Sequence, residues 1–392
     1  MKRIQLLERP EWKKSAESLG FGFHTIQGER YWDESVAYAF SLSEIESKIE
    51  DPTQEIHDMT IDLVGDIMKS EELLRKLHIP EKMWDYVKNS WYSNEMHLYG
   101  RMDLAYDGKG DAKLFELNYD TPTSLFEASF FQWTWLEEAM QLGILNKNCD
   151  QYNSIQEKLI LAFSYIAMKH KAGLHFASVS GSTEDLGTIE YLRDCAHQAG
   201  ISTKLMTMEN IAWADEFNTF VDDNKDRIDV LFKLYPWEHL FEDDREGLLL
   251  RSSVTLLEPS WKSVLSNKGI LPLLWEKHAG HPNLLPSYFE ESDKEKIQPG
   301  WVRKRLFSRE GANVDIALMD GQMISSDGDY GSGPTSIQKA HPLTYFGDKK
   351  SGGYPVIGSW VIGDSACGMG IREDDSIITR DTSRFIPHFI EE

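Results

Sequence analysis

Cysteine is scarce in this chain of 392 residues: Cys149, Cys195 and Cys367 lie far apart and form no CxxC pair. An odd number of distant cysteines predicts neither a disulfide framework nor a zinc site. Long apolar runs are missing too, because no segment approaches the roughly 20 apolar residues of a membrane span. The N-terminal MKRIQLLERPEWKK has no apolar stretch of the kind that a signal peptide carries. We therefore expect a cytoplasmic protein with no membrane partner.

Positive charge is the second deficit. The chain has 41 Lys and Arg against 64 Asp and Glu, a formal net charge of -23. Nucleic acids and anionic membranes bind clustered positive charge, so neither is an expected partner. Two interpretations of the acidic excess stay open: it keeps a cytosolic enzyme in solution, or it attracts a cationic substrate such as an amine.

Four common catalytic signatures are absent as well. The chain has no G-x-x-x-x-G-K-[ST], no G-x-G-x-x-G between a strand and a helix, no H-E-x-x-H and no G-x-S-x-G. These absences leave the two commonest nucleotide motifs, the zinc-protease helix and the nucleophile elbow without support. One nucleotide scheme stays open, in which lysines from separate strands or loops hold phosphates while carboxylates hold magnesium.

The chain does have the size and the patterns of a mixed α/β protein. With 41% hydrophobic residues it can build a large core with two or three subdomains. Residues 34–89 have helical periodicity, and residues 125–140 form an aromatic-rich predicted helix. From about residue 150 helices and strands alternate, which favours a sheet with a parallel portion. The expected elements are helices 154–169 and 186–199 and strands 174–180, 202–206 and 229–235.

The last third is richer in strand patterns, separated by turn residues, and predicts antiparallel structure. Its expected strands are 301–306, 313–318, 322–325, 356–362 and 376–379. The chain thus divides into three predicted portions: a helical lead-in with a hairpin (1–150), an α/β portion (151–260) and a β-rich portion (261–392).

The most informative segment is YGRMDLAYDGKGDAKLFELNYDTPTSL, residues 99–125. Two runs of alternating polarity flank a turn signal at 107–111, which predicts a β-hairpin. If the turn is centred between residues 109 and 110, opposite residues sum to 219. Asp103 then faces Glu116, and Arg101 faces Asn118.

Two carboxylates facing each other at about 5 Å are destabilising unless something cationic lies between them. A hard divalent ion satisfies this need, because Mg²⁺ takes oxygen ligands from one or two carboxylates and completes its shell with phosphates and water. Arg101, next to such an ion, can hold a phosphoryl group through a fork of hydrogen bonds.

Four further features each allow a plain and a functional interpretation. Lys268 and Lys304 are either solvated surface cations or phosphate ligands. Glu184 and Asp185 follow a predicted strand end, where α/β sheets place ligands, but acids in a first helical turn are also favoured by the helix dipole. The glycine-rich residues 363–372 are either a hairpin loop or a loop that closes over a ligand.

In order along the chain, these segments resemble the synthetase half of glutathionylspermidine synthetase and its stand-alone acid–amine ligase relatives, which belong to the ATP-grasp group. The matching landmarks are YGRMD (99–103), FELNYDTPTSL (115–125), KLYPWE (233–238), EPSWKSVLSNKGILPLLW (258–275), VRKRLFSREGANV (302–314) and IGDSACGMGIR (362–372). An ordered series is far more specific than any single lysine or glycine. The resemblance therefore favours the functional interpretation of each feature and implies an ATP-grasp-type architecture.

The resemblance implies an ATP-dependent ligase that joins a carboxylate to an amine through an acyl phosphate. Matched by position, Asp103, Glu116 and Asn118 are the expected ligands of magnesium, with two ions expected. Arg101 is expected to steady the phosphoryl group, and Arg372 to act as the arginine of a mobile loop. The remaining implied contacts are Lys268, Lys304 and Gln338 for the nucleotide, and Glu184 and Asp185 for the amine or peptide substrate.

Departures from the family pattern concern the substrates. Thr121 and Thr123, both expected substrate residues, stand where the glutathione-using enzyme has serines, and Leu234 stands where a hydroxyl residue is expected. A lost hydrogen-bond partner costs a bound polar group about 1–3 kcal/mol, which counts against glutathione as the acid. The bifunctional enzyme also carries an amidase domain, and we expect synthetase activity without amidase activity here.

Two other functions stay open at this point. One is an ATP-grasp kinase that releases its phosphorylated product. The other is a catalytically silent protein that binds nucleotide, amine or peptide, although such a protein has no reason to keep two opposed carboxylates. From their glycines and the proposed closing role, we expect residues 363–372 to be partly disordered without ligand. How many chains associate is not predicted.

Overall fold

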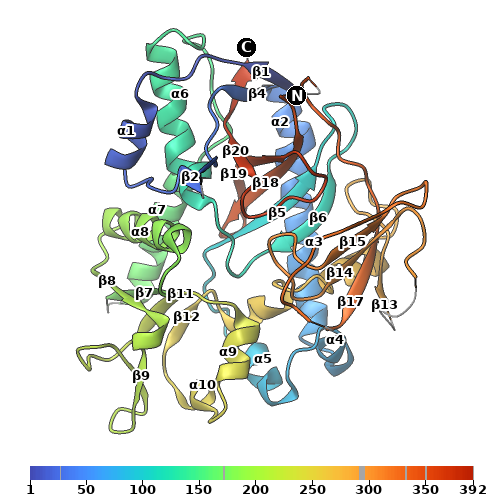
Figure 1. The fold of residues 1–392 in the computed structure, drawn as a ribbon. Helices are drawn as coiled ribbons and strands as arrows, with labels where there is room; N and C mark the ends of the chain where they lie inside the picture. Colours follow the sequence, from blue (N-terminus) through green and yellow to red (C-terminus); the bar gives the residue numbers. More distant parts are fainter. Residues whose placement is uncertain (27, 171–172, 291–295, 332, 349–350, 392) are drawn as a thin grey trace.

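The computed structural model describes residues 1–392 except 27, 171–172, 291–295, 332, 349–350 and 392 (Figure 1). Three larger sheets and the helices between them form a mixed α/β fold, as the sequence predicts. Two of these sheets are antiparallel and one is parallel. The predicted three-part division of the chain stays a prediction.

The first antiparallel sheet contains the predicted hairpin, which is confirmed. Its strands, in spatial order, are β20 (Arg384–Ile386), β19 (Ser365–Asp374), β18 (Tyr354–Ile362), β5 (Tyr99–Ala105) and β6 (Lys113–Asn118). Asp103 lies opposite Glu116 and Arg101 opposite Asn118, as expected. A register shift follows Asp103, so that the turn is not centred where the sum of 219 places it. The pairing at the site end of the hairpin is nevertheless the predicted one.

The second antiparallel sheet lies beside the hairpin, at the right of Figure 1. Its strands are β13 (Ser287–Glu290), β17 (Thr335–Lys339), β14 (Trp301–Arg305), β15 (Val314–Ala317) and β16 (Met323–Ser325). Three of the strands expected in the last third are found here.

The prediction of a strand at 376–379 is wrong, because this segment forms bends. The Asp374 carboxylate accepts hydrogen bonds from the Ser376 backbone N–H, the Ser383 hydroxyl and the Arg380 guanidinium. Such local side-chain bonds compete with a strand ladder and turn the chain.

The parallel sheet confirms the α/β prediction for the middle of the chain. Its strands are β12 (Thr255–Leu257), β11 (Val230–Leu234), β7 (Leu174–Ser178) and β8 (Thr203–Thr207), connected through α8 (Thr183–Gln198) and preceded by α7 (Ile155–Lys169). Every residue of β7 and β11 is buried, as is typical of central parallel strands that are covered on both faces.

A small three-stranded sheet joins the two ends of the chain, which lie close together in Figure 1. Here β4 (Val36–Ser41) pairs with both β1 (Lys2–Gln5) and β21 (His388–Glu391). The helical interpretation of residues 34–89 is therefore wrong at its start. Five consecutive residues of β4 are buried, so its pattern carries no helical period.

The remaining elements include α3 (Asp51–Ile67), whose buried Ile56, Leu63, Val64 and Ile67 recur with helical spacing against the core. The other helices are α1 (Trp12–Ser18), α2 (Leu42–Ile45), α4 (Glu71–Lys76), α5 (Trp84–Tyr92), α6 (Gln132–Gln141), α9 (Trp237–Asp243), α10 (Leu248–Arg251) and α11 (Ile270–Lys277). Short helical turns are η1 (Glu46–Glu50), η2 (Glu81–Met83), η3 (Glu127–Phe131), η4 (Met208–Asn210) and η5 (Ser260–Val264). Short strands are β2 (Thr25–Ile26), β3 (Glu29–Arg30), β9 (Ala212–Ala214) and β10 (Thr219–Val221).

The glycine-rich segment 363–372 is a strand rather than a loop. Only Gly363 and Asp364 form the turn between β18 and β19, and Arg372 lies within β19 opposite Val356. The expectation of a mobile loop here is wrong, and the hairpin interpretation is correct. Glycine serves close packing instead, since a Cβ at Gly370 would lie 2.7 Å from the Phe385 ring.

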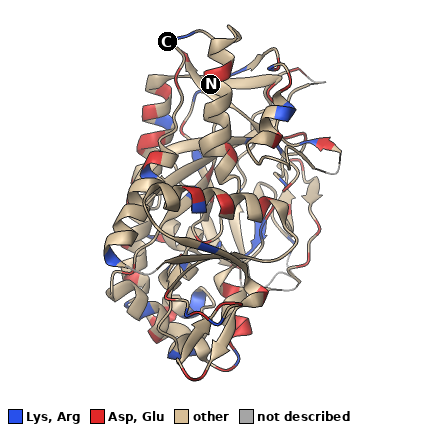
Figure 2. Cartoon of the chain, turned by 90° about the vertical axis from the view of Figure 1, so that its left-hand side faces the viewer, with Lys and Arg blue, Asp and Glu red and all other residues tan. Residues whose placement is uncertain are grey.

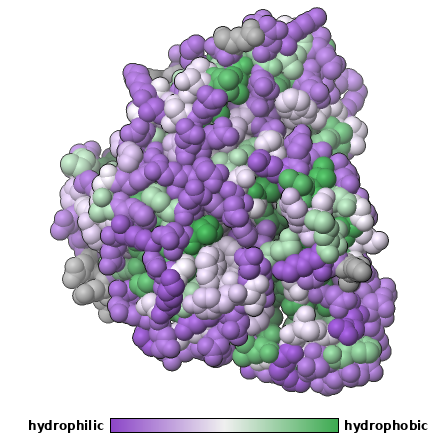
Figure 3. All heavy atoms as spheres, turned by 180° about the vertical axis from the view of Figure 1, so that it is seen from behind, coloured by the Kyte–Doolittle hydropathy of each residue, from purple (hydrophilic) through white to green (hydrophobic). Residues whose placement is uncertain are grey.

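The surface agrees with the acidic composition. In the view of Figure 2, Asp and Glu segments are spread over many elements, with Lys and Arg segments scattered among them. Hydrophilic side chains cover most of the face in Figure 3, with small separate hydrophobic patches. Within the described part of the chain, no helix is long and apolar enough to span a membrane.

Gly100 in β5 gives a test of the packing beneath the site. A Cβ at this position would lie 2.7 Å from three ring atoms of Tyr119, which follows β6, so Gly100→Ala should lower the free energy of unfolding by about 1–3 kcal/mol. Gly65→Ala in α3 is the control, because its Cβ meets only Trp91 at 3.7 Å and helix propensity should stabilise it by up to about 1 kcal/mol. Urea unfolding of both variants measures the difference, and equal effects would contradict the proposed close approach.

Candidate functional site

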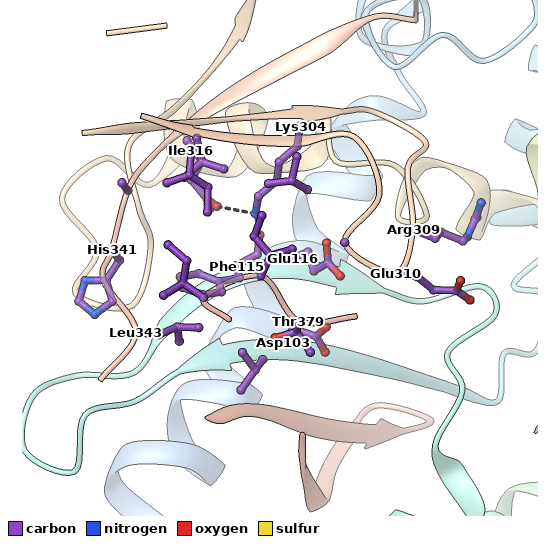
Figure 4. A pocket seen from close by; sticks show the side chains of 18 of the residues that line it. Asp103, Phe115, Glu116, Lys304, Arg309, Glu310, Ile316, His341, Leu343 and Thr379 are labelled. Atoms are coloured by element: carbon purple, nitrogen blue, oxygen red, sulfur yellow. Dashed lines mark hydrogen bonds between the residues drawn. The ribbon is translucent and has the colours of Figure 1, made fainter. Parts of the chain in front are cut away.

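A cavity of about 550 Å³ lies between the two antiparallel sheets, with walls from both. Figure 4 shows Lys304 reaching down from β14 towards Phe115 and Glu116 on the hairpin. Nine of the predicted site residues line this cavity: Arg101, Asp103, Glu116, Asn118, Thr121, Thr123, Lys304, Gln338 and Arg372. Residues that are up to 271 positions apart in the sequence therefore meet in one place.

The two opposed carboxylates are each bonded to a cation of the protein. Arg101 donates to both oxygens of Asp103, at 2.7 and 3.2 Å. Lys268 Nζ lies 3.1 Å from Glu116 Oε2, and the Asn118 amide donates to Glu116 Oε1 at 3.3 Å. The cation that the hairpin requires between its carboxylates is thus supplied in part by side chains.

Both lysines are buried, so their interpretation as solvated surface cations is wrong. Lys268 and Lys304 are each 8% exposed. Lys304 Nζ donates to the Phe115 carbonyl and to Gln338 Oε1, each at 2.9 Å. Lys268 Nζ donates to the Ser308 carbonyl as well as pairing with Glu116. A buried lysine needs such partners, because an isolated ammonium is costly to remove from water.

Burial and charge together set the protonation of the site. Burial by itself would raise the pKa of Glu116, but Lys268 and Lys304 reverse this and lower it to about 2. Burial lowers the pKa of Lys304 to about 8, although Glu116 opposes the shift. Burial raises the pKa of Asp103 and repulsion from Glu116 adds to it, while Arg101 opposes the shift. Asp103 is therefore the carboxylate that is least well compensated by the protein.

Glu184 and Asp185 lie in the first turn of α8, capped by Ser182, and do not line the cavity. The helix-dipole interpretation of these acids thus fits their position. Glu184 nevertheless interacts with two residues of the site, Arg372 and Thr123. Burial raises the pKa of Glu184, while the charge of Arg372 and a hydrogen bond with Thr123 oppose this rise. The Asp185 backbone N–H donates to the Ser182 hydroxyl, which caps the helix.

Arg372 projects from β19 into the cavity and the small pocket beside it. It donates to the Arg380 carbonyl, while its buried Nε has no hydrogen-bond partner among the described residues. Its position in a paired strand means that the arginine is held in place by the sheet. Leu234, by contrast, is buried in the core and does not line the cavity.

Three residues of the loop after β14, Arg309, Glu310 and Gly311, line the cavity but were not among the predicted site residues. Arg309 pairs with Glu238, which comes from the KLYPWE landmark. Their place in the landmark VRKRLFSREGANV was the signal that could have identified them. Figure 4 places Glu310 at the end of the cavity opposite His341.

A second missed group lies beside Arg372 and joins distant parts of the chain. The Tyr31 hydroxyl donates to Glu127 at 2.6 Å and lies 3.1 Å from the Ser124 hydroxyl. Burial and the neighbouring Glu184 raise the pKa of Glu127 to about 7. Glu127 belongs to the short π-helical turn η3, a feature often found at functional sites. No sequence pattern connected Tyr31 with this group.

The far end of the cavity is apolar. Its walls come from both antiparallel sheets and from the segment after β17, and include Phe115, Val302, Ile316, Ile324 and Leu343. Such a surface can accept a flat apolar ring, while the charged end holds the cations and carboxylates.

The oxygen donors of the hairpin fit magnesium. Within the described residues, no three His, Cys, Asp or Glu side chains form a group that could hold a metal by themselves. Mg²⁺ does not need such a group, because it binds one or two carboxylates and takes other ligands from water and phosphate. Asp103 and Glu116 provide the carboxylates, and Asn118 adds an amide oxygen, all on one side of the cavity.

Comparison with solved structures defines the class of fold. The chain resembles a glutathione synthetase-like effector of Globodera pallida, with a TM-score of 0.57 at 10% identity, covering 91% of this chain and 89% of that one. At this level of identity the likeness concerns the fold alone.

The family model "Glutathionylspermidine synthase preATP-grasp" matches residues 3–391, and the chain belongs to this family. It is 38% identical to a Haemophilus influenzae protein named "Putative acid--amine ligase", over 99% of both chains. It is 28% identical to trypanothione synthetase of Crithidia fasciculata over 83% of this chain, and spans about half (52%) of that longer protein.

The raised pKa of Glu127 makes a prediction about stability. Because its folded pKa of about 7 exceeds the unfolded value of 4.5, the stabilisation it contributes is present below pH 4.5 and is lost as the pH rises through 7. Glu127→Gln cannot ionise and keeps an oxygen for Tyr31. The free energy of unfolding of the variant minus that of the wild type should therefore increase by about 2 kcal/mol from pH 5 to pH 8. Urea unfolding at the two pH values tests this, and a difference that does not change with pH would refute it.

Proposed function

We propose that the protein is an ATP- and Mg²⁺-dependent acid–amine ligase that forms an amide bond through an acyl phosphate. One observation carries the proposal: Asp103 and Glu116 face each other beside Arg101, Lys268 and Lys304 at the charged end of a cavity whose other end is apolar. A nucleotide triphosphate has this same polarity, with a flat ring at one end and a polyanion at the other. Membership of the family supports the assignment.

The proposed phosphate end uses the buried cations. Lys268 and Lys304 would contact the nucleotide phosphates. Lys268 pairs with Glu116, and Lys304 lies near enough to Glu116 to lower the pKa of that carboxyl. A metal bound to Glu116 would leave both lysines available for phosphate oxygens. Asp103, Glu116 and Asn118 hold magnesium, with two ions expected. Bound Mg²⁺ supplies positive charge to phosphate oxygens, which is what phosphoryl transfer chiefly requires.

In the proposed first step, a carboxylate oxygen of the acid attacks the γ-phosphorus. An O–P bond forms, the bond from that phosphorus to the β–γ bridging oxygen breaks, and ADP leaves with the electron pair. Arg101 lies where it can steady the group in transit, because its guanidinium is fixed by Asp103 and by the Thr123 carbonyl at 2.9 Å. Positioning and charge are the main contributions that a protein makes to this chemistry.

In the proposed second step, the amine nitrogen attacks the acyl carbon and phosphate leaves. The cationic amine first loses one proton to solvent, which frees the lone pair that forms the C–N bond. The C–O bond to phosphate then breaks, and the nitrogen gives its second excess proton to the leaving phosphate. Arg372 stabilises the charge that develops on the carbonyl and phosphate oxygens. Because it lies on a strand, it does so without a loop having to close.

The acid and the amine are proposed to meet beside Thr121 and Thr123, with Glu184 and Asp185 on the amine side. The amine is a cation before it reacts, which suits this acidic neighbourhood. The relatives' names mention glutathionylspermidine and trypanothione, so small peptides and polyamines are the first classes to test. Leu234 lies in the core, so its difference from the family does not decide against glutathione.

The ligase assignment predicts that ADP release requires both an acid and an amine. Purified protein with Mg-ATP should be screened against a matrix of amino acids, short peptides and polyamines, with mass spectrometry of the products. A product with the mass of the condensed pair is the expected result. Phosphorylated acid released without any amine would instead identify a kinase, and nucleotide-induced thermal stabilisation without turnover would identify a binding protein.

The metal assignment predicts that Glu116→Gln lowers the ADP-forming rate by at least about 100-fold, because the substitution removes a charged ligand while keeping the side chain's shape. Asp111→Asn in the same hairpin is the matched control, since its exposed carboxylate pairs with Lys48 on the surface and does not line the cavity. Initial rates at saturating Mg-ATP compare the two. Near-normal turnover in Glu116→Gln would rule out its role as a metal ligand.

A further inference from the structure

Gln338 lines the cavity, but both ends of its amide are already bound to the protein. Its Nε2 donates to the Leu114 carbonyl at 3.1 Å, and its Oε1 accepts from Lys304 Nζ at 2.9 Å. The residue is 4% exposed. A glutamine held at both ends has a fixed orientation, and its acceptor oxygen is directed at the lysine.

Lys304 is held by hydrogen bonds to the same two strands, β6 and β17. Its Nζ donates to the Phe115 carbonyl of β6 in addition to Gln338 Oε1 of β17. In the ladder between β17 and β14, Gln338 lies opposite Val302. Val302 is two residues before Lys304 in β14, so the side chains of Val302 and Lys304 share one face of the sheet. The pair of Gln338 and Lys304 therefore joins the lysine's own sheet to consecutive carbonyls, Leu114 and Phe115, on the hairpin.

This arrangement leaves the lysine few alternatives. An unconstrained lysine side chain samples many rotamers, and ordering one of them costs conformational entropy. The charges around Lys304 come from Glu116, Lys268 and Asp103, and they act from the hairpin and from the segment before α11. The two neutral acceptors, the Phe115 carbonyl and Gln338 Oε1, also fix the position of the Lys304 ammonium, in addition to these charges.

We propose that Gln338 is a positioning residue that acts through Lys304: it sets the ammonium where the phosphate chain binds. The resemblance implies only a contact with the nucleotide for Gln338, and this role goes beyond that expectation. The inference rests on the proposed function in one respect, namely that Lys304 binds phosphate.

Calorimetric titration with two ligands separates the two roles. Mg-ATP and Mg-tripolyphosphate share a phosphate chain, but only the first has a base. Gln338→Met keeps the length of the side chain and removes both hydrogen bonds, so it should weaken binding of both ligands by about tenfold. A loss confined to Mg-ATP would overturn the proposal, because it would show that Gln338 contacts the base.

A double-mutant cycle shows whether Gln338 acts through the lysine. In a Lys304→Met background, Gln338→Met should change the dissociation constant of Mg-tripolyphosphate by less than twofold, because the group it positions is gone. Full additivity of the two substitutions would contradict the proposal. The cycle also detects a general loss of structure caused by Gln338→Met, because such a loss would weaken binding further in the Lys304→Met background.

A third measurement needs no nucleotide and so does not depend on the proposed function. Reductive methylation read out by mass spectrometry at individual lysines should become severalfold faster at Lys304 in Gln338→Met, because its ammonium loses an acceptor, while Lys268 serves as the internal control. An unchanged rate at Lys304 would overturn the proposal. If the wild-type protein binds neither ligand, the proposed function fails, while the labelling result still decides the role of Gln338.

Discussion

The site depends on an electrostatic conflict within one hairpin. Asp103 and Glu116 face each other across two strands, an arrangement that is stable only with compensating positive charge. The protein supplies part of it from the hairpin itself, through Arg101, and part from two distant segments, through Lys268 and Lys304. The hairpin therefore cannot be understood alone, because its two acids are stable only when the second antiparallel sheet and the segment before α11 lie over it.

This constraint explains how the sheets are joined. Lys304 and Gln338 bond to consecutive carbonyls of β6, and Lys268 bonds to the Ser308 carbonyl in the loop after β14. Each of these hydrogen bonds comes from a charged or polar side chain and joins two segments around the cavity. The cavity is thus held by the same groups that are proposed to bind phosphate, so their positions are set before a ligand arrives. Such preorganisation favours catalysis.

The acidic side of the cavity has a different character. Glu127, Glu184 and Glu310 surround Arg372, and burial raises the pKa of each of these acids. Here the protein holds more carboxylate than it neutralises, whereas around Glu116 it holds enough cation to keep the acid ionised. The two ends of the proposed reaction centre are therefore opposite in charge balance, which suits a polyanion at one end and a cationic amine at the other.

Local pattern sufficed for the elements whose signal is short-range. The alternation around 107–111 predicts the hairpin and its pairing, and the strands and helices of the parallel sheet follow from periodicity. Local pattern failed at residues 363–372, where glycines that indicate a loop instead allow Phe385 and Ala128 to pack against β19. It also failed at 376–379, where the Asp374 carboxylate turns the chain.

The sequence by itself determined which residues carry charge and which pairs share a strand face, because strand geometry fixes these at short range. Its ordered landmarks also determined the family. Only the tertiary structure decided that Lys268 and Lys304 are buried, that Gln338 binds Lys304, and that Tyr31 and Glu127 lie beside Arg372. These facts depend on contacts between segments tens to hundreds of residues apart, and no local propensity encodes such contacts.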